Sequence, residues 1–215
     1  MINATKTQLI ILKSPRRKLP DDFSLEVGGV KIEPARFVQL LGLTIDQHLT
    51  FREHIEVTVK KCNAALGVLN RAAQYLPQEL LKLAYLALVR SHAEYCSAVF
   101  NSAARSNLLK LDTIQRKAAR VVCHAPRDAH ADPLLEMLQL KSLQDRRDEH
   151  ILQLVDATLA EKTHPALRDL VVVEPNGRLR EAAHRTVAAG RGFRVAAARL
   201  YNSRIDNAPD LTGVH

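Results

Sequence analysis

Aromatic side chains are scarce in this 215-residue sequence, making up 4% of it, and tryptophan is absent. Single-stranded nucleic acids are held largely by bases stacked on aromatic rings, so this composition argues against that mode of binding. The three cysteines, Cys62, Cys96 and Cys123, are too few and too widely spaced for a disulfide framework. No apolar run approaches the roughly 20 residues that span a bilayer, and polar residues among the first ten exclude a secretory signal. We expect a soluble, intracellular protein, in the nucleus or the cytoplasm.

Motifs of several common enzyme classes are also missing. The sequence contains no Walker A loop, no Gly-x-Ser-x-Gly and no His-Glu-x-x-His. Nucleotidyl transfer needs clustered carboxylates that hold two metal ions about 4 Å apart. The adjacent pair Asp21-Asp22 follows Pro20 in a polar stretch, whereas such acids belong on a tight hairpin between apolar strands. We interpret the pair as part of a solvated loop and predict no catalytic residue.

Residues that ligate zinc are grouped between Cys123 and Asp132. Their spacing fits no closed set of four ligands, so we interpret the group as a chance cluster in a loop between helices. Cys62 and Cys96 lie on or beside apolar helical faces and are interpreted as small core residues. We predict neither a metal site nor a cofactor in this chain.

A positive charge is the clearest property that is present. The formal net charge is +8 and the isoelectric point is near 9.6. Such a balance favours a polyanionic partner, and nucleic acid is the commonest intracellular polyanion. The hydrophobic content of 47% is enough for one core or two small ones.

The first part of the chain has the patterns of short strands. The apolar run Leu9–Leu12 is typical of a buried strand. Residues 23–27 alternate, Gly28-Gly29 makes a turn, and residues 30–32 complete a hairpin. Residues 37–45 indicate one further strand. We expect a small antiparallel remnant over residues 1–49 that needs a partner to cover it.

The rest of the sequence is helical. Thr50 and Glu53 form a capping-box pattern before a helix over 51–73, whose apolar stripe we predict to be Ile55, Val59, Cys62, Leu66 and Leu69. A second helix begins after Pro77 and ends near residues 91–95, with a mostly apolar surface that indicates burial. A third is capped by Ser102 and reaches Val121.

Two further helices are predicted in the last part of the chain. One opens at residues 132–133, and the other runs from a cap at Ser142 to about Glu161. Asn176-Gly177 marks a turn, residues 178–194 are basic and weakly patterned, which indicates flexibility, and a short helix covers 195–201. The fold class is mainly α with a small β remnant (α+β). Its parts are 1–49, a helical bundle over 50–125, and a helical segment over 126–215.

Basic residues recur on one face of the first and third predicted helices. Such a face is usually only a solvated surface. If the two faces lie side by side, they form a groove that follows a phosphate backbone. The candidate contacts are Lys60, Lys61, Arg71, Lys110, Arg116, Lys117 and Arg120.

Short motifs in a fixed order resemble the end of the polymerase domain, the thumb and the C-terminal segment of a jockey-like non-LTR retrotransposon reverse transcriptase. The matching pieces are Asn3–Leu9, Leu41–Asp46, Tyr75–Pro77, Glu94–Ser97, Ile114–Arg120, Leu138–Leu143 with Arg146-Arg147, and Arg199–Ser203. The resemblance implies that the parent protein is an RNA-directed DNA polymerase. It also implies that Leu41, Gly42 and Asp46 belong to a primer-grip-like segment and that the helices hold an RNA/DNA template-primer duplex.

The sequence departs from that family in ways that bear on its function. The fingers, most of the palm and the Tyr-x-Asp-Asp hairpin would lie before Met1, and no endonuclease domain is visible. Ser91 stands where a proline is common, and Tyr201 where a tryptophan is usual. In the parent family Mg²⁺ would be held by palm residues that this chain lacks. The resemblance therefore implies a truncated copy that does not polymerise DNA by itself.

Two other interpretations remain open. The helical module is either a non-enzymatic protein-interaction unit, with self-association through an exposed apolar surface, or an inert retroelement relic. An active polymerase would require additional sequence upstream.

Overall fold

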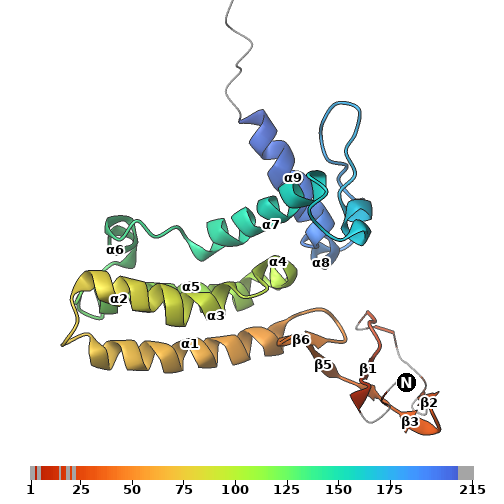
Figure 1. Cartoon of the computed structure of the whole chain (residues 1–215), viewed down its shortest axis with the longest axis horizontal. Coiled ribbons are helices and arrows are strands. Elements are labelled where there is room, and N and C mark those ends of the chain that lie inside the picture. The colour runs from red at the N-terminus through yellow and green to blue at the C-terminus, as the bar shows by residue number, and fades with distance from the viewer. Residues whose placement is uncertain (1–2, 4–5, 15, 18–19, 21–22, 208–215) are drawn as a thin grey trace, which may run out of the picture.

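A computed structural model of the protein describes residues 3, 6–14, 16–17, 20 and 23–207. Short strands come first in the chain and lie to one side, and most of the remaining described chain is helical, as the α+β prediction requires (Figure 1). No helix in the described ranges is both long enough and apolar enough to cross a membrane.

The strands pair two by two. They are β1 (Leu9–Ile10), β2 (Leu25–Val27), β3 (Val30–Ile32), β4 (Pro34–Ala35), β5 (Phe37–Leu40) and β6 (Leu43–Asp46). The predicted hairpin is confirmed as the antiparallel pair β2–β3, with Leu25 opposite Ile32. The expectation of an antiparallel remnant is wrong for β1–β4, which is parallel with Leu9 opposite Pro34. The expected burial of Leu9–Leu12 is also wrong, since Leu12 is exposed.

The predicted strand over 37–45 is in fact a hairpin. β5 and β6 are antiparallel, with Leu40 opposite Leu43. The chain reverses at Leu41 and Gly42, which have φ angles of 48° and 81°. Two left-handed residues in succession give the tight turn that matches the twist of paired strands. Leu41 is not a residue that favours this conformation, so the turn carried no clear sequence signal.

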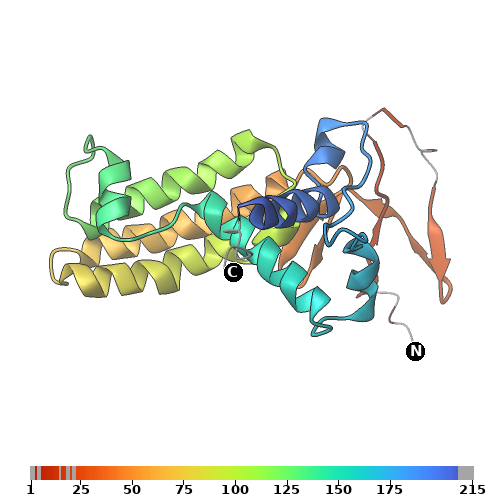
Figure 2. The same ribbon diagram turned by 90° about the horizontal axis from the view of Figure 1, so that it is seen from above.

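Three helical arms lie side by side and form a bundle (Figures 1 and 2). The first is α1 (Arg52–Ala72), the second joins α2 (Gln78–Ala84), the π-helix η2 (Tyr85–Arg90) and α3 (Ser91–Glu94), and the third is α5 (Arg105–Val122), preceded by the single turn α4 (Ser97–Phe100). Their shared core contains the predicted α1 stripe, with Ile55, Cys62, Leu66 and Leu69 buried and Val59 partly so. The expected burial of the second arm is only partly right, because Leu80, Leu83 and Leu88 are exposed.

Helix starts differ from the predicted caps. At α1 the N-cap is Phe51, and the Thr50 hydroxyl donates to Asp46 at 3.1 Å, so the capping box with Glu53 does not form. At α5 the N-cap is Ala104 instead of Ser102. The Ser142 cap is confirmed, because the Ser142 hydroxyl accepts the backbone N–H of Asp145 at 3.0 Å. Of these three helix starts, the sequence identified the capping residue correctly only at α7.

The C-terminal part packs a second, smaller core. Its elements are α6 (Ala131–Met137), α7 (Leu143–Leu159), the 3₁₀ turn η3 (Pro165–Leu170), α8 (Val187–Gly190) and α9 (Phe193–Asp206). Ile151 and Val155 of α7 are buried against Ala197 and Ala198 of α9. Leu138 and Leu143, by contrast, belong to the core of the bundle. The predicted turn at Asn176-Gly177 is present, and the last helix is longer than predicted.

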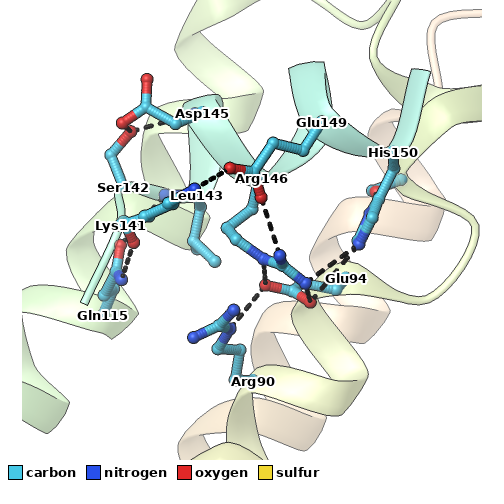
Figure 3. Close-up of polar contacts among 11 residues, drawn as sticks. Arg90, Glu94, Gln115, Lys141, Ser142, Leu143, Asp145, Arg146, Glu149 and His150 are labelled. Atoms are coloured by element: carbon cyan, nitrogen blue, oxygen red, sulfur yellow. Dashed lines mark hydrogen bonds and ion pairs between the residues drawn. The ribbon is translucent and has the colours of Figure 1, made fainter. Parts of the chain in front are cut away.

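Polar contacts join α7 to the bundle (Figure 3). Arg146 donates to both carboxylate oxygens of Glu94 at 3.0 and 3.1 Å, and Arg90 donates to the same carboxylate at 2.5 Å. Close by, Gln115 donates to the carbonyl of Lys141 at 2.9 Å. Glu94, Gln115 and Arg146 all lie within the motifs that carry the family resemblance. In this fold they hold the C-terminal part against the bundle.

Candidate nucleic-acid interface

A cleft of about 750 Å³ lies between α1 and α5. Its basic lining comes from Lys117 and Arg120 on α5 and from Arg127 in the loop that follows. Asn63 and Asn70 line it from α1, and no carboxylate occurs among its described lining residues. We call this hollow the α1–α5 cleft. It presents cations and amides together, and these are the groups that bind phosphate oxygens.

Two of the predicted α1 contacts flank this cleft. A helix turns by about 100° per residue, so Lys60 lies on the same face as Asn63 and Gly67. Arg71 is placed directly, because its Nη1 is 3.8 Å from where a β-carbon on Gly67 would stand. Gly67 lines the cleft. Lys60 and Arg71 therefore extend the basic lining along α1.

Lys61 lies on a different side of α1. It is one residue beyond Lys60 and therefore about 100° further round the helix. Burial lowers the pKa of His54, and the nearby charge of Lys61 lowers it further. His54 packs beside Phe100 on the core side, with ring centroids 5.3 Å apart. Lys61 is thus not brought together with the cleft residues.

The predicted cations of α5 also divide. Lys117 lines the cleft with its side chain exposed, and Arg120 lines it while its Nε donates to the carbonyl of Ala129 at 2.8 Å. Lys110 is on the same face about two turns earlier, but it donates to Glu56 at 3.3 Å. Arg116 points away, toward the side of Asp112. The structure gathers Lys117 and Arg120 at the cleft, pairs Lys110 with an acid, and separates Arg116.

The primer-grip-like residues form the β5–β6 turn and the joint that follows it. Leu41 is 84% exposed, and its carbonyl accepts the Tyr95 hydroxyl at 2.6 Å. Gly42 faces the Tyr95 ring. Asp46 is buried and accepts from the backbone N–H groups of Thr50 and Phe51 at 3.1 and 2.7 Å.

Asp46 has the electrostatics of a structural carboxylate. Burial alone would raise its pKa, but hydrogen bonds from the backbone of Thr50, His48 and Phe51 hold the pKa below its ordinary value. With its oxygens directed at the start of α1, this carboxylate fixes the angle at which the hairpin meets the bundle. Asp46 therefore positions Leu41 and Gly42.

Sequence reasoning missed Asn63, Asn70, His124 and Arg127, which all line the cleft. Asn63 and Asn70 follow the helical spacing of Lys60 and Gly67, so their position on the same face of α1 could have been inferred from the sequence. Arg127 lies in an irregular loop where no periodicity exists, and its approach to α1 depends on the tertiary fold.

The chain has no evident metal centre in its described part. No group of three or more His, Cys, Asp or Glu side chains is placed there to hold a metal ion. Asp21 and Asp22 lie outside the described residues. The zinc-ligand types around Cys123 are not gathered, since His124 turns into the cleft. The described residues do not fit a magnesium pair.

Comparison with known proteins gives one distant relative at the level of sequence. Over 130 residues the chain is 24% identical to a protein of Drosophila melanogaster named as the probable RNA-directed DNA polymerase from transposon BS. The match covers 59% of this chain and 14% of that protein. No protein family model matches, and no solved structure matches. The similarity supports an origin related to the reverse transcriptases of transposons.

Proposed function

We propose that this chain is a thumb-containing fragment of a jockey-like reverse transcriptase, in which the α1–α5 cleft holds the backbone of an RNA/DNA template-primer duplex. The observation that carries the proposal is a cleft lined by Lys117, Arg120 and Arg127 with no acid among its described lining residues. The distant similarity to a transposon polymerase supports the choice of nucleic acid as the polyanion.

In this proposal the fragment binds and does not catalyse. Exposed cations neutralise successive phosphates, and the side-chain amides of Asn63 and Asn70 donate to phosphate oxygens, so the grip is independent of base sequence. Lys60 and Arg71 extend it along the duplex. The β5–β6 turn, held by Asp46 and Tyr95, presents Leu41 and Gly42 beside the bundle.

The test compares two double variants that change charge equally. Lys117→Glu with Arg127→Glu reverses two cations at the cleft, whereas Lys61→Glu with Arg116→Glu reverses two cations on other faces. Affinity for an RNA/DNA hybrid is measured by fluorescence anisotropy at several salt concentrations. We expect the cleft variant to bind at least tenfold more weakly, with a log–log salt slope shallower by about 2, since each phosphate contact contributes about 0.9.

The control variant, Lys61→Glu with Arg116→Glu, distinguishes binding at the cleft from nonspecific attraction to the net positive charge. We expect it to keep most of the affinity and nearly the whole salt slope. Equal losses in both variants would show that the hybrid responds only to net charge, and the assignment of the cleft would then be abandoned. Binding that is equally weak for hybrid, duplex DNA and single strands would favour the relic interpretation.

Self-association is a second candidate, favoured by the exposed leucines of the second arm. Leu80, Leu83 and Leu88 are exposed on an arm whose opposite side, with Leu81 and Val89, is buried in the core. Apolar side chains on the outer side of this arm leave apolar surface in contact with water, which a partner surface would cover. We therefore propose that a second copy of the chain covers this face. A monomer by light scattering at high concentration, unchanged by Leu83→Gln with Leu88→Gln, would exclude it.

A further inference from the structure

A second hollow, of about 430 Å³, lies where the C-terminal part meets the bundle. It is lined by residues from the first half of α5, the first half of α7 and the α8–α9 region. Four arginines line it, namely Arg105, Arg147, Arg191 and Arg199, against the two aspartates Asp112 and Asp148. We call this hollow the α5–α7–α9 cavity. None of its residues belongs to the α1–α5 cleft.

Arg147 is the unusual member of this cavity. Its side chain is 2% exposed, yet its Nε and Nη1 have no hydrogen-bond partner among the described residues. The third nitrogen, Nη2, donates to Gln144 Oε1 at 3.0 Å and lies 3.8 Å from Asp112 Oδ1. A guanidinium stays charged in proteins, and a buried charge without partners is costly. Two of its nitrogens are therefore buried donors without an acceptor, on a residue that lines the cavity.

The acids of the cavity lie near this charge but do not accept hydrogen bonds from Arg147 Nε or Nη1. Burial raises the pKa of Asp112, although the charges of Arg147, Arg116 and Arg105 act against the rise. Burial raises the pKa of Asp148 as well. Asp112 Oδ1 also lacks a hydrogen-bond partner, because 3.8 Å is beyond hydrogen-bond reach of Arg147. Arg147 therefore lies near acidic charge while two of its nitrogens keep no acceptor, and the four arginines outnumber the two aspartates only over the cavity as a whole.

The other arginines differ in how far they are already used. Arg191 donates through Nε to the carbonyl of Ser102 at 3.1 Å, which fixes its stem. Arg199 pairs with Glu181, which does not line the cavity. Arg105 is exposed and makes no ion pair with a described residue. Arg105 at the rim and Arg147 inside thus provide cationic donors for an anion at the entrance and in the interior of the cavity.

We propose that the α5–α7–α9 cavity binds a phosphate group, with Arg147 Nε and Nη1 as its buried donors and Arg105 and Arg191 at its rim. The planar guanidinium matches the oxygens of phosphate, and several such groups around one hollow favour a ligand of high negative charge. The volume lies in the range of small-ligand sites. The phosphate comes either from a free ion, such as pyrophosphate, or from the backbone of an oligonucleotide, and separate titrations with the two distinguish these sources.

The test is isothermal titration calorimetry of the full chain with pyrophosphate, and separately with a short oligonucleotide, at constant ionic strength. Arg105→Gln with Arg191→Gln removes the rim cations, and Arg194→Gln, three residues after Arg191 at the start of α9, is the control away from the cavity. We expect the rim variant to bind pyrophosphate at least tenfold more weakly and the control to bind as the parent does. Binding of the oligonucleotide alone, lost in the rim variant, would identify the backbone as the source.

A buried variant keeps the proposal testable at Arg147 itself. Arg147→Gln alone leaves Asp112 unpaired, so it is combined with Asp112→Asn, which removes both charges and leaves amides in their place. We expect this pair to fold and to lose phosphate binding. The proposal would be overturned if neither ligand gave a heat of binding, or if the melting temperature were equal in phosphate and in chloride at matched ionic strength. The cavity would then hold only water beside the contact between Arg147 and Asp112. Because the α1–α5 cleft is untouched in these variants, their effects are separate from the proposed grip on the duplex.

Discussion

The basic side chains of this protein are used in opposite ways in two regions. Around the α1–α5 cleft, Lys60, Arg71 and Lys117 make no ion pair with any described residue. Against α7 and α9, Arg146 pairs with Glu94 and Arg204 pairs with Asp156. Cations that form ion pairs within the chain stabilise the packing of its helices, whereas cations without an ion pair are available to a binding partner. The formal charge of +8 alone does not distinguish the two uses.

The largest expected effect comes from breaking the paired region. Glu94→Gln removes the charge that Arg90 and Arg146 share, and the Glu94 side chain is only 15% exposed. Two cations are then left partly buried without a counter-charge. We expect a loss of about 2 kcal/mol in the free energy of unfolding, measured in urea.

The matched control for Glu94→Gln is Glu174→Gln. Glu174 pairs with Arg180 at 3.3 Å, but both side chains are more than a third exposed. Such surface pairs contribute about 0–1 kcal/mol. If the two variants lose the same free energy of unfolding, the contacts in Figure 3 do not stabilise the packing of α7 on the bundle. The contrast between paired and unpaired cations in the two regions would then be wrong.

Lowering the pH protonates Glu94 and so removes the same negative charge without a mutation. Burial would raise the pKa of Glu94, but hydrogen bonds from Arg146 and Arg90 bring it below the ordinary 4.5. The stabilisation from Glu94 is complete above the unfolded-state pKa and is lost as the pH falls through the lower folded-state pKa. The difference in unfolding free energy between the parent and Glu94→Gln should therefore narrow as the pH drops from 7 to below 4.5. A difference independent of pH would mean that the carboxylate charge is not what stabilises this contact.

The fold was predictable wherever it depends on local periodicity. Ile55, Cys62, Leu66 and Leu69 are buried as predicted, because helical spacing alone sets which side chains share a face. The β5–β6 hairpin was missed, since its turn uses Leu41 at a position that normally takes asparagine or glycine. The bounds of α1 were predicted to within a residue, but its capping box was wrong because Asp46, at the end of the preceding strand, takes over the role of the local cap.

The candidate interface was predictable only in part. Helical spacing placed Lys60 and Lys117 on outer faces, which the structure shows to be exposed. It gave no indication that Lys110 meets Glu56, because the two residues are 54 positions apart. Arg146 and Arg147 look alike in sequence, yet one binds Glu94 and the other is enclosed in a cavity. Pairing between distant residues decides whether a cation is available.

The smallest expected effect comes from converting one paired cation near the cleft into an unpaired one. Glu56 accepts hydrogen bonds from Arg52 at 3.1 Å and from Lys110 at 3.3 Å, and these bonds lower its pKa. Glu56→Gln leaves Lys110 without its counter-charge on the α5 face that also carries Lys117. If the cleft holds a duplex, we expect a few-fold gain in affinity for an RNA/DNA hybrid and a salt slope steeper by about 1.

Glu79→Gln is the control, since it makes the same change in net charge at an exposed position on α2. We expect it to leave the salt slope unchanged. The urea midpoint should be the same in both variants, because exposed charges contribute little to stability. An equal gain in affinity from Glu79→Gln would trace the effect to total charge. A gain confined to Glu56→Gln would instead show that Glu56, which the packing of α1 on α5 brings to Lys110, keeps Lys110 from contacting a phosphate. Whether this lysine binds within the chain or to a partner would then depend on a single acid.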